Sequence, residues 1–386
     1  MQTYFKHIFF YILQMNIDFI LIVRYNLYKT FNQCERTLLM VTLKEIAKMC
    51  DVSVTTVSNV LNDKPKVSEE TRQRVLGVVK QTGYQPNYFA QGMRKQKTRI
   101  IGIIVEDLEL FSTPPIVEAI MAYCDENNYR TILVNMRLYD RWRDTWYSNE
   151  KIIQSVLQPS IQELLSVKVD GIMYVAGHCR YINYFMDDFK IPAIIVYALS
   201  SSSRFSSVVF DDEKGGYDIT KYLISKGHRK IGVIAGSANN LHTQMRSMGY
   251  QRALFEEQIL FNPDLIKHGD WMRTSGYIQA ENMVKEGVTA IFCMNDLMAA
   301  GAYDYLYENN IIVGKDISIV GYDNNEISAY LRPRLTTNNI PLKTIGKTAA
   351  EFFVDLLDNE SGNSKGQQII KLPCNMVKRE SVGDIQ

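Results

Sequence analysis

Short apolar runs at regular intervals constrain the fold of this chain more than any other feature. The run Ile100–Val105 contains no polar side chain, as expected for a parallel strand that is buried on both faces. Stretches with helical spacing separate such runs, and this alternation predicts an α/β fold of doubly wound units with parallel sheets. Further strands are predicted at 131–134, 171–175, 193–196, 230–234, 290–293 and 317–320.

These runs are numerous enough for two parallel sheets, and we therefore expect a core, residues 100–386, that consists of two lobes. One lobe is predicted at about 100–198 plus 334–363, and the other at 205–333 plus 367–382. The serine run at 200–203 is interpreted as a linker between the lobes.

A long segment at 137–158 stands out within the first predicted lobe. It carries Trp142 and Trp146 among charged residues. Exposed aromatic residues beside charges indicate a lid or an interaction surface. Local packing beneath a long loop is the alternative interpretation.

A different pattern, at 40–85, predicts a small all-α domain of three short helices. Thr42 and Glu45 have the spacing of a capping box before a helix that ends near Cys50. Ser53 is placed to cap a second helix over 54–62, after a turn of a few residues. Ser68 and Gly83 are similarly placed to start and stop a third helix. Two short helices joined by such a turn predict a helix-turn-helix, although the spacing also fits a plain three-helix bundle.

The net charge of +1 hides an uneven distribution over the 386 residues. Residues 40–99 carry 11 Lys and Arg against 5 Asp and Glu, whereas 100–386 carry 28 against 35. A basic head on an acidic body is expected where only the head meets phosphate. A solvated basic face is the alternative that charge alone leaves open.

Signals for metal, cofactor and catalytic chemistry are missing from the sequence. The six cysteines form no C-x-x-C pair, and the five histidines form no H-E-x-x-H. The chain also lacks a P-loop, a G-x-G-x-x-G fingerprint and a G-x-S-x-G elbow. We therefore expect no metal site, no cofactor and no enzyme, in a protein of the reducing cytoplasm.

The first 39 residues differ from the rest, because they hold two apolar stretches that polar residues interrupt. Neither stretch reaches the roughly 18–20 residues of a membrane span, and no cleavage site for a signal peptide follows. A membrane anchor remains one interpretation. We favour a start of translation at Met40, directly before the capping box, and expect no membrane partner.

The motif V-T-L-K-E-I-A-K-M-C-D-V-S-V-T-T-V-S-N-V-L-N, from Val41 to Asn62, resembles the head of the lactose-repressor (LacI/GalR) family. V-S-E-E-T-R-Q-R-V and then G-Y-Q-P-N, between Val67 and Asn87, resemble the same family in order and spacing. The resemblance implies a sequence-specific DNA-binding transcriptional regulator, a repressor controlled by a small effector. It implies a homodimer on a double-stranded palindromic operator.

The resemblance also implies how the head meets DNA. Val54 and Thr55 match base-reading positions, and Asn59 stands where many members have Arg, which leaves the operator sequence open. A hinge helix and linker are expected over 86–99, with Met93 wedged into a base step in the minor groove. The implied DNA contacts are Thr42, Ser53, Val54, Thr55, Thr56, Ser58, Asn59, Asn62, Tyr84, Asn87, Ala90 and Met93.

For the core, the resemblance implies a two-lobed periplasmic-binding-protein-like fold that holds an effector between its lobes. The expected contacts are Leu110, Phe111, Tyr197, His242, Arg246, Trp271, Asn295 and Asp323. A carboxylate and an amide suit hydroxyl pairs and an indole suits an apolar sugar face, so we expect a carbohydrate-like effector. Taken singly, Asp323 could cap a turn and Trp271 could be core. A pure solute-binding module is the competing function.

Overall fold

The computed structural model describes residues 41–61, 63–84, 97–146, 149–185, 189–359 and 367–385. Two compact units divide the chain, Met1–Gln91 and Gly92–Gln386. The N-terminal stretch 1–39 and most of the expected hinge, including Met93, lie outside the described residues. None of the helices within the described ranges is long and apolar enough to cross a membrane.

The N-terminal unit contains the three expected helices, and their caps follow the predicted chemistry. Thr42 and Glu45 form the capping box, with Glu45 N–H donating to Thr42 Oγ1 at 3.3 Å and Thr42 N–H donating to Glu45 Oε2 at 2.7 Å. Gly83 ends the third helix at φ 64°, in the left-handed region. The helices are α2 (Leu43–Met49), α3 (Val54–Leu61) and α4 (Glu69–Thr82).

One small apolar core holds these helices together. Its buried residues come from all three helices and from the turn after the first. Helix α3 buries Val57 and Val60 on its inner side, whereas Thr55 on it is exposed. The buried set is Ile46, Ala47, Cys50, Val57, Val60 and Val75.

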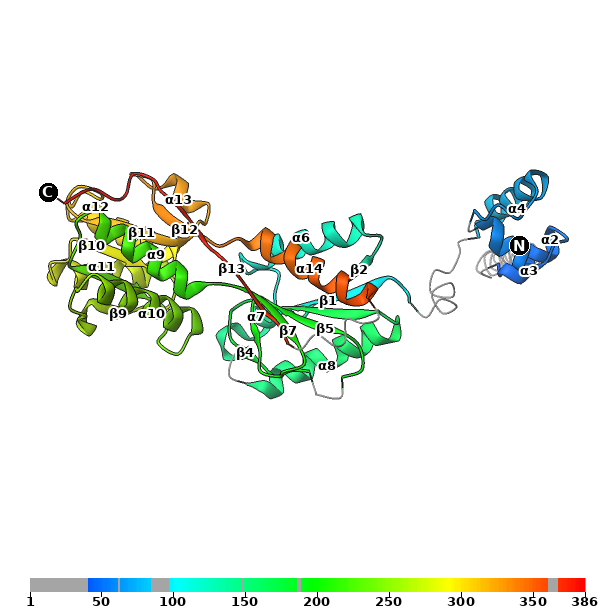
Figure 1. Cartoon of the computed structure of the whole chain (residues 1–386), viewed down its shortest axis with the longest axis horizontal. Helices are drawn as coiled ribbons and strands as arrows, with labels where there is room; N and C mark the ends of the chain where they lie inside the picture. The colour runs from blue at the N-terminus through cyan, green and yellow to red at the C-terminus, as the bar shows by residue number, and fades with distance from the viewer. Residues whose placement is uncertain are drawn as a thin grey trace, which may run out of the picture. The chain divides into compact units, whose positions relative to one another are not determined.

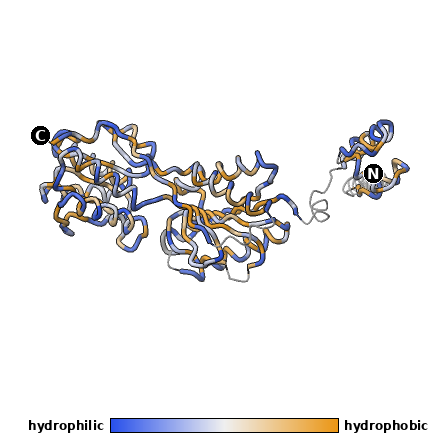
Figure 2. Tube along the Cα trace, in the orientation of Figure 1, coloured by the Kyte–Doolittle hydropathy of each residue, from blue (hydrophilic) through white to orange (hydrophobic). Residues whose placement is uncertain are grey.

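The first lobe of the C-terminal unit is built on a six-stranded parallel sheet of order β13-β7-β5-β3-β1-β2 (Figure 1). Ile101, Ile103 and Val105 share one core cluster with α6 and α14, whereas Ile100 and Ile104 share another with α8. This period of two shows a sheet buried on both faces, and Figure 2 shows the hydrophobic strands at its centre. The elements are β1 (Ile100–Val105), β2 (Arg130–Asn135), β3 (Gly171–Val175), β5 (Ala193–Val196), β7 (Ser206–Phe210), β13 (Ile369–Leu372), α6 (Thr113–Glu126), α8 (Glu150–Ser166) and α14 (Leu342–Asp358).

The second lobe has another six-stranded sheet, of order β14-β12-β11-β10-β8-β9, with only β14 antiparallel to its neighbour. Helix α9 packs against α10, and α11 packs against α12. The α9–α10 contact is so close that a Cβ on Gly249 would lie 2.0 Å from the carbonyl oxygen of Glu213. The elements are β8 (Ile231–Ala235), β9 (Ile266–His268), β10 (Ala290–Cys293), β11 (Ser318–Asp323), β12 (Thr336–Asn339), β14 (Asn375–Val377), α9 (Asp212–Ser225), α10 (Leu241–Glu256), α11 (Arg273–Lys285), α12 (Asp296–Glu308), α13 (Ile327–Tyr330) and η2 (Pro263–Leu265).

The chain passes between the lobes three times, and this changes the expected lobe boundaries. Strand β7 was expected in the second lobe but pairs with β5 in the first. Conversely, β12 was expected in the first lobe but pairs with β11 in the second. Strand β13, expected in the second lobe, pairs with β7 in the first. Strands β7 and β13 therefore belong to the first sheet, and β12 belongs to the second. The chain crosses between the lobes after each of these three strands.

Two smaller expectations were also wrong. The serine run 200–203 is not the linker between lobes, because strands on both sides of it belong to the first lobe and Leu199–Ser200 (β6) pairs with Tyr181–Ile182 (β4). The segment 137–158 is not one long loop, since it forms α7 (Leu138–Trp142), η1 (Arg143–Trp146) and the start of α8. Trp146 is fully buried, which confirms local packing for that residue.

Candidate functional site

The exposed face of α3 is the candidate DNA-reading surface in the N-terminal unit. Val57 and Val60 are buried, whereas Thr55 is exposed and Asn59 is partly exposed. Thr55 and Asn59 are four residues apart and so share one face of the helix. Asn59 can pair with an adenine edge, and the small side chain of Thr55 lets the helix approach closely.

The other expected DNA contacts divide into two groups. Val54, Thr56, Ser58 and Tyr84 are partly buried, while Thr42 and Ser53 are exposed. Both exposed hydroxyls also serve the fold, because Thr42 Oγ1 donates to Glu45 Oε2 at 2.9 Å and Ser53 Oγ accepts from Thr56 N–H at 3.0 Å. The remaining positions, Asn62, Asn87, Ala90 and Met93, lie outside the described residues.

In the C-terminal unit, Arg246 is the centre of the candidate effector site. It projects from α10, where its Nε donates to Asp212 Oδ1 at 2.7 Å and its Nη1 donates to the carbonyl of Met294. The guanidinium lies 3.6 Å from the ring centroid of Tyr322 and 5.9 Å from that of Trp271. The side chain is almost fully buried, so these contacts hold its charge in one place.

Asp212, at the start of α9, connects Arg246 to His242. Its second oxygen, Oδ2, lies 2.7 Å from His242 Nδ1. Burial alone would raise the pKa of Asp212, but the neighbouring His242 and Arg246 hold that pKa below its ordinary value. A buried carboxylate with two such partners therefore stays ionised and fixes both side chains.

Trp271 and Asn295 lie beside Arg246 in the second lobe. The indole covers Gly236 so closely that a Cβ there would lie 1.9 Å from Trp271 Cζ2. Asn295 accepts from Met298 N–H at 2.8 Å as the cap of α12, and its amide donates to the Trp271 carbonyl at 2.9 Å. Asn295 therefore positions the tryptophan segment in this structure.

Asp323 ends β11 with φ at 104°, and Asn324 follows at 53°. Two consecutive residues in the left-handed region indicate a strained turn, a feature that recurs at binding sites. Burial raises the pKa of Asp323 well above its ordinary value, against the lowering effect of Arg246. The turn is secured by Asp296, which accepts from Asn325 N–H at 2.7 Å and from Thr337 Oγ1 at 2.6 Å.

The first lobe contributes aromatic and apolar side chains. Tyr197 is buried, with its ring centroid 5.4 Å from that of Phe210 and 5.9 Å from that of His242. Leu110 lies over Gly177, and Phe111 is 47% exposed. Tyr197 contacts His242, His242 and Arg246 share the partner Asp212, and Arg246 lies beside Trp271. The structure thus brings these expected residues together, while Phe111 lies at the surface.

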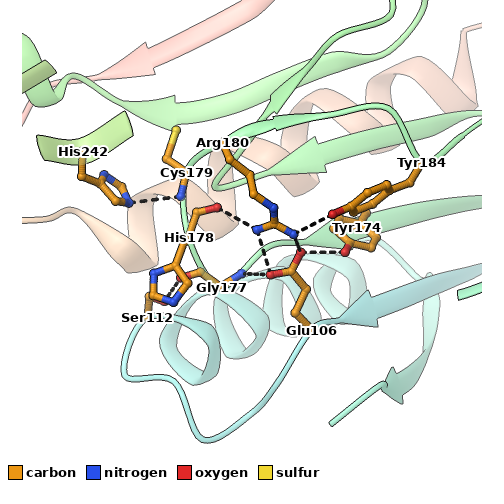
Figure 3. Close-up of polar contacts among 9 residues, drawn as sticks. All are labelled: Glu106, Ser112, Tyr174, Gly177, His178, Cys179, Arg180, Tyr184 and His242. Carbon is orange, nitrogen blue, oxygen red and sulfur yellow. Dashed lines mark hydrogen bonds and ion pairs between the residues drawn. The ribbon is translucent and has the colours of Figure 1, made fainter. Parts of the chain in front are cut away.

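A buried ion pair shapes the loop of the first lobe that faces His242 (Figure 3). Glu106, directly after β1, is fully buried and pairs with Arg180. The carboxylate also accepts from Tyr174 Oη at 2.6 Å and from Gly177 N–H at 2.7 Å. Residues 177–180 are thereby held so that the N–H of Cys179 donates to His242 Nε2 at 3.1 Å.

Sequence reasoning missed Glu106, Arg180 and Asp212. A signal was present for the two acids, because each follows an apolar strand run and ligands of α/β sheets bind beyond the carboxyl ends of strands. Their partners come from elements 30 or more positions away along the chain. Pairing over that distance is not visible in a single sequence.

Both units resemble protein families that have been described. Residues 42–87 match the family of bacterial regulatory proteins of lacI type, and residues 220–382 match a periplasmic binding protein-like domain. The first match covers the three helices, and the second covers most of the second lobe together with α14 and the last strands. The periplasmic-binding-protein-like architecture expected from the sequence is confirmed.

Two curated relatives and one solved structure extend the similarity to almost the whole chain. The chain is 30% identical to the HTH-type transcriptional repressor PurR of Vibrio cholerae over 351 residues, which is 90% of this chain and 99% of the relative. It is 30% identical to the ribose operon repressor of Haemophilus influenzae, over 89% of this chain and 99% of the relative. A Lac repressor dimer bound to operator and the anti-inducer ONPF matches with a TM-score of 0.71 and 28% identity, over 88% of this chain and 98% of that one.

Proposed function

Since the chain belongs to the LacI family and is therefore a DNA-binding transcriptional regulator of repressor type, we propose that a small carbohydrate-like effector controls its affinity for a palindromic operator. The observation that carries this proposal is the grouping around Arg246. A fixed guanidinium lies beside the Trp271 indole, and the Asp323 carboxyl lies within its electrostatic reach. These groups suit the hydroxyl pairs and the apolar face of a sugar ring.

Two relatives support the choice of effector class and the assembly. The ribose operon repressor is named for a sugar operon, and the Lac repressor structure is a dimer bound to operator. We propose that this chain also acts as a homodimer in the cytoplasm. One head reads too few base pairs to define a site in a genome, so two heads on a palindromic double-stranded operator provide the needed specificity.

The eight expected effector residues have different proposed roles. Arg246, Trp271 and Asp323 contact the effector, and Asn295 positions Trp271. His242 and Tyr197 close the site from the interface of the lobes, while Leu110 and Phe111 cover it from the first lobe. In the head, Val54, Thr55 and Asn59 read bases, and Met93 is the wedge in the minor groove. The residues that contact phosphate or position the helix are Thr42, Ser53, Thr56, Ser58 and Asn62.

The substitution Asp323→Ala tests the effector site. We expect the variant to bind operator as the parent does and to lose its response to the effector, which a thermal-shift screen of sugars and nucleosides would first identify. The surface substitution Asp304→Ala, on the outer side of α12 where it pairs with Arg273, is the matched control. A normal response of the Asp323→Ala variant would show that the site is elsewhere.

A further inference from the structure

His242 connects the two lobes through direct contacts with the first lobe. It belongs to α10 of the second lobe and is almost fully buried. Its Nε2 lies 3.1 Å from the backbone N of Cys179, in the loop after β3 of the first lobe (Figure 3). Its ring stacks on Phe210, the last residue of β7, at a centroid distance of 5.5 Å and an interplanar angle of 18°.

These contacts determine the protonation of the imidazole. A backbone N–H can only donate, so Nε2 of His242 must be the unprotonated acceptor. The proton therefore lies on Nδ1, which donates to Asp212 Oδ2 at 2.7 Å. Asp212 is an ionised acceptor and cannot supply a proton itself, so it selects this tautomer of His242.

The same carboxylate holds Arg246 through Nε at 2.7 Å. One buried group thus joins the guanidinium of the effector site to the hydrogen bond between the lobes. We propose that Asp212 is a positioning residue that couples the effector site to lobe closure by fixing the tautomer of His242. The coupling rests on the proposed function of Arg246, whereas the choice of tautomer does not.

An effector that binds the guanidinium of Arg246 changes the hydrogen bond between Arg246 Nε and Asp212. The hydrogen bond between the Asp212 carboxylate and His242 Nδ1 changes with it. The Cys179 N–H meets the best acceptor only while Nδ1–H points at Asp212. A change at Arg246 is therefore transmitted to the first lobe over three successive hydrogen bonds, from Arg246 to Asp212, from Asp212 to His242 and from His242 to the Cys179 N–H. Glu106 supports this path from the other side, because it holds the N–H of Gly177 and the side chain of Arg180 in the same loop.

Asp212→Asn tests the proposal with almost no change in shape. The amide oxygen can still accept from Arg246 Nε, but the amide nitrogen then faces His242 Nδ1 as a donor. The imidazole must respond by moving its proton to Nε2, which then opposes the Cys179 N–H. The matched control is Asp211→Asn, which removes the same charge one residue earlier, where Asp211 caps α9 by accepting from Lys214 N–H at 3.0 Å.

Two measurements on the full-length protein without ligand decide the outcome. Nitrogen-15 NMR of the imidazoles, assigned with His242→Gln, should show protonated Nδ1 in the parent and in Asp211→Asn but protonated Nε2 in Asp212→Asn. Hydrogen exchange at the Cys179 amide should be roughly 3- to 10-fold faster in Asp212→Asn, as expected for one lost hydrogen bond. An unchanged tautomer or unchanged exchange in the folded variant would overturn the proposal.

A second pair of variants keeps the test decisive if Asp212→Asn does not fold. His242→Gln retains an acceptor near Cys179, whereas His242→Leu retains the bulk without one, so fast exchange of the Cys179 amide is expected only in the leucine variant. Arg246→Met tests the coupling and should also accelerate this exchange, because Asp212 loses its second partner. If no sugar binds the protein, the effector proposal fails while these ligand-free results still decide the role of Asp212.

Discussion

Removing the charge of Glu106 should destabilise the C-terminal unit strongly. Its two carboxylate oxygens receive hydrogen bonds from Tyr174, Gly177 and Arg180. The substitution Glu106→Gln leaves one oxygen for these donors, and its amide group must face at least one of them. It also takes the carboxylate charge away from the guanidinium of Arg180.

Breaking a buried ion pair in this way costs about 3–5 kcal/mol of unfolding free energy. A unit as large as Gly92–Gln386 loses about 2 °C of Tm per kcal/mol, so we expect Tm to fall by about 6–10 °C. Scanning calorimetry or thermal melting followed by circular dichroism would measure the change. The transition to follow is that of the C-terminal unit, because the small N-terminal unit lies apart from this pair in the chain.

A double-mutant cycle with Arg180→Met separates charge pairing from packing. Methionine keeps an apolar stem beside Trp146, over whose ring the guanidinium lies at 5.0 Å. If the ion pair dominates, the double variant should be more stable than the sum of the single effects by about 2 kcal/mol. Additive losses, or a fall of less than about 2 °C for Glu106→Gln alone, would refute the assignment of the energy to this pair.

Three further predictions concern other parts of the chain. Thr42→Ala removes the capping box of α2 and should cost the N-terminal unit about 1 kcal/mol in urea unfolding; an unchanged midpoint would mean that the cap is not needed. Burial raises the pKa of Asp296 to about 7 from about 4 in the unfolded chain, so the stability it contributes is complete below about pH 4 and is lost as the pH rises through 7. This loss, at most about 4 kcal/mol, should be absent from the pH profile of Asp296→Ala, and an identical profile would assign it to another group. Met93→Ala should weaken binding to operator more than binding to random DNA in a gel-shift assay, whereas equal losses would contradict the wedge.

The sequence predicted the elements better than their assembly. The strands at 100–105, 171–175, 193–196 and 290–293 have the bounds that the apolar runs indicate, because burial on both faces leaves a clear signal in each run. The predicted lobe boundaries were wrong for β7, β12 and β13. An apolar run predicts a buried strand but does not indicate which of the two sheets that strand joins. Hydrogen bonding between segments far apart in the chain decides that assignment.

The candidate site shows the same division. Arg246 and His242 could be named from the sequence, and the structure places them together on α10. Their common partner Asp212 follows an apolar strand run, but the sequence does not show that it pairs with His242 and Arg246, which lie 30 or more positions away. Asn295 was expected at the effector, yet its amide caps α12 and holds the Trp271 carbonyl, a local role that spacing alone does not reveal.

The three crossovers have a consequence for synthesis on the ribosome. Strands β13 and β14 occupy one edge of each sheet, and both are encoded in the last segment of the chain, at 369–377. Until that segment has left the exit tunnel, the edges of β7 and β12 lack their neighbours at the same time. Nascent chains should therefore depend on chaperones late rather than early, and a stop codon near residue 366 should damage both lobes at once, because open strand edges invite aggregation.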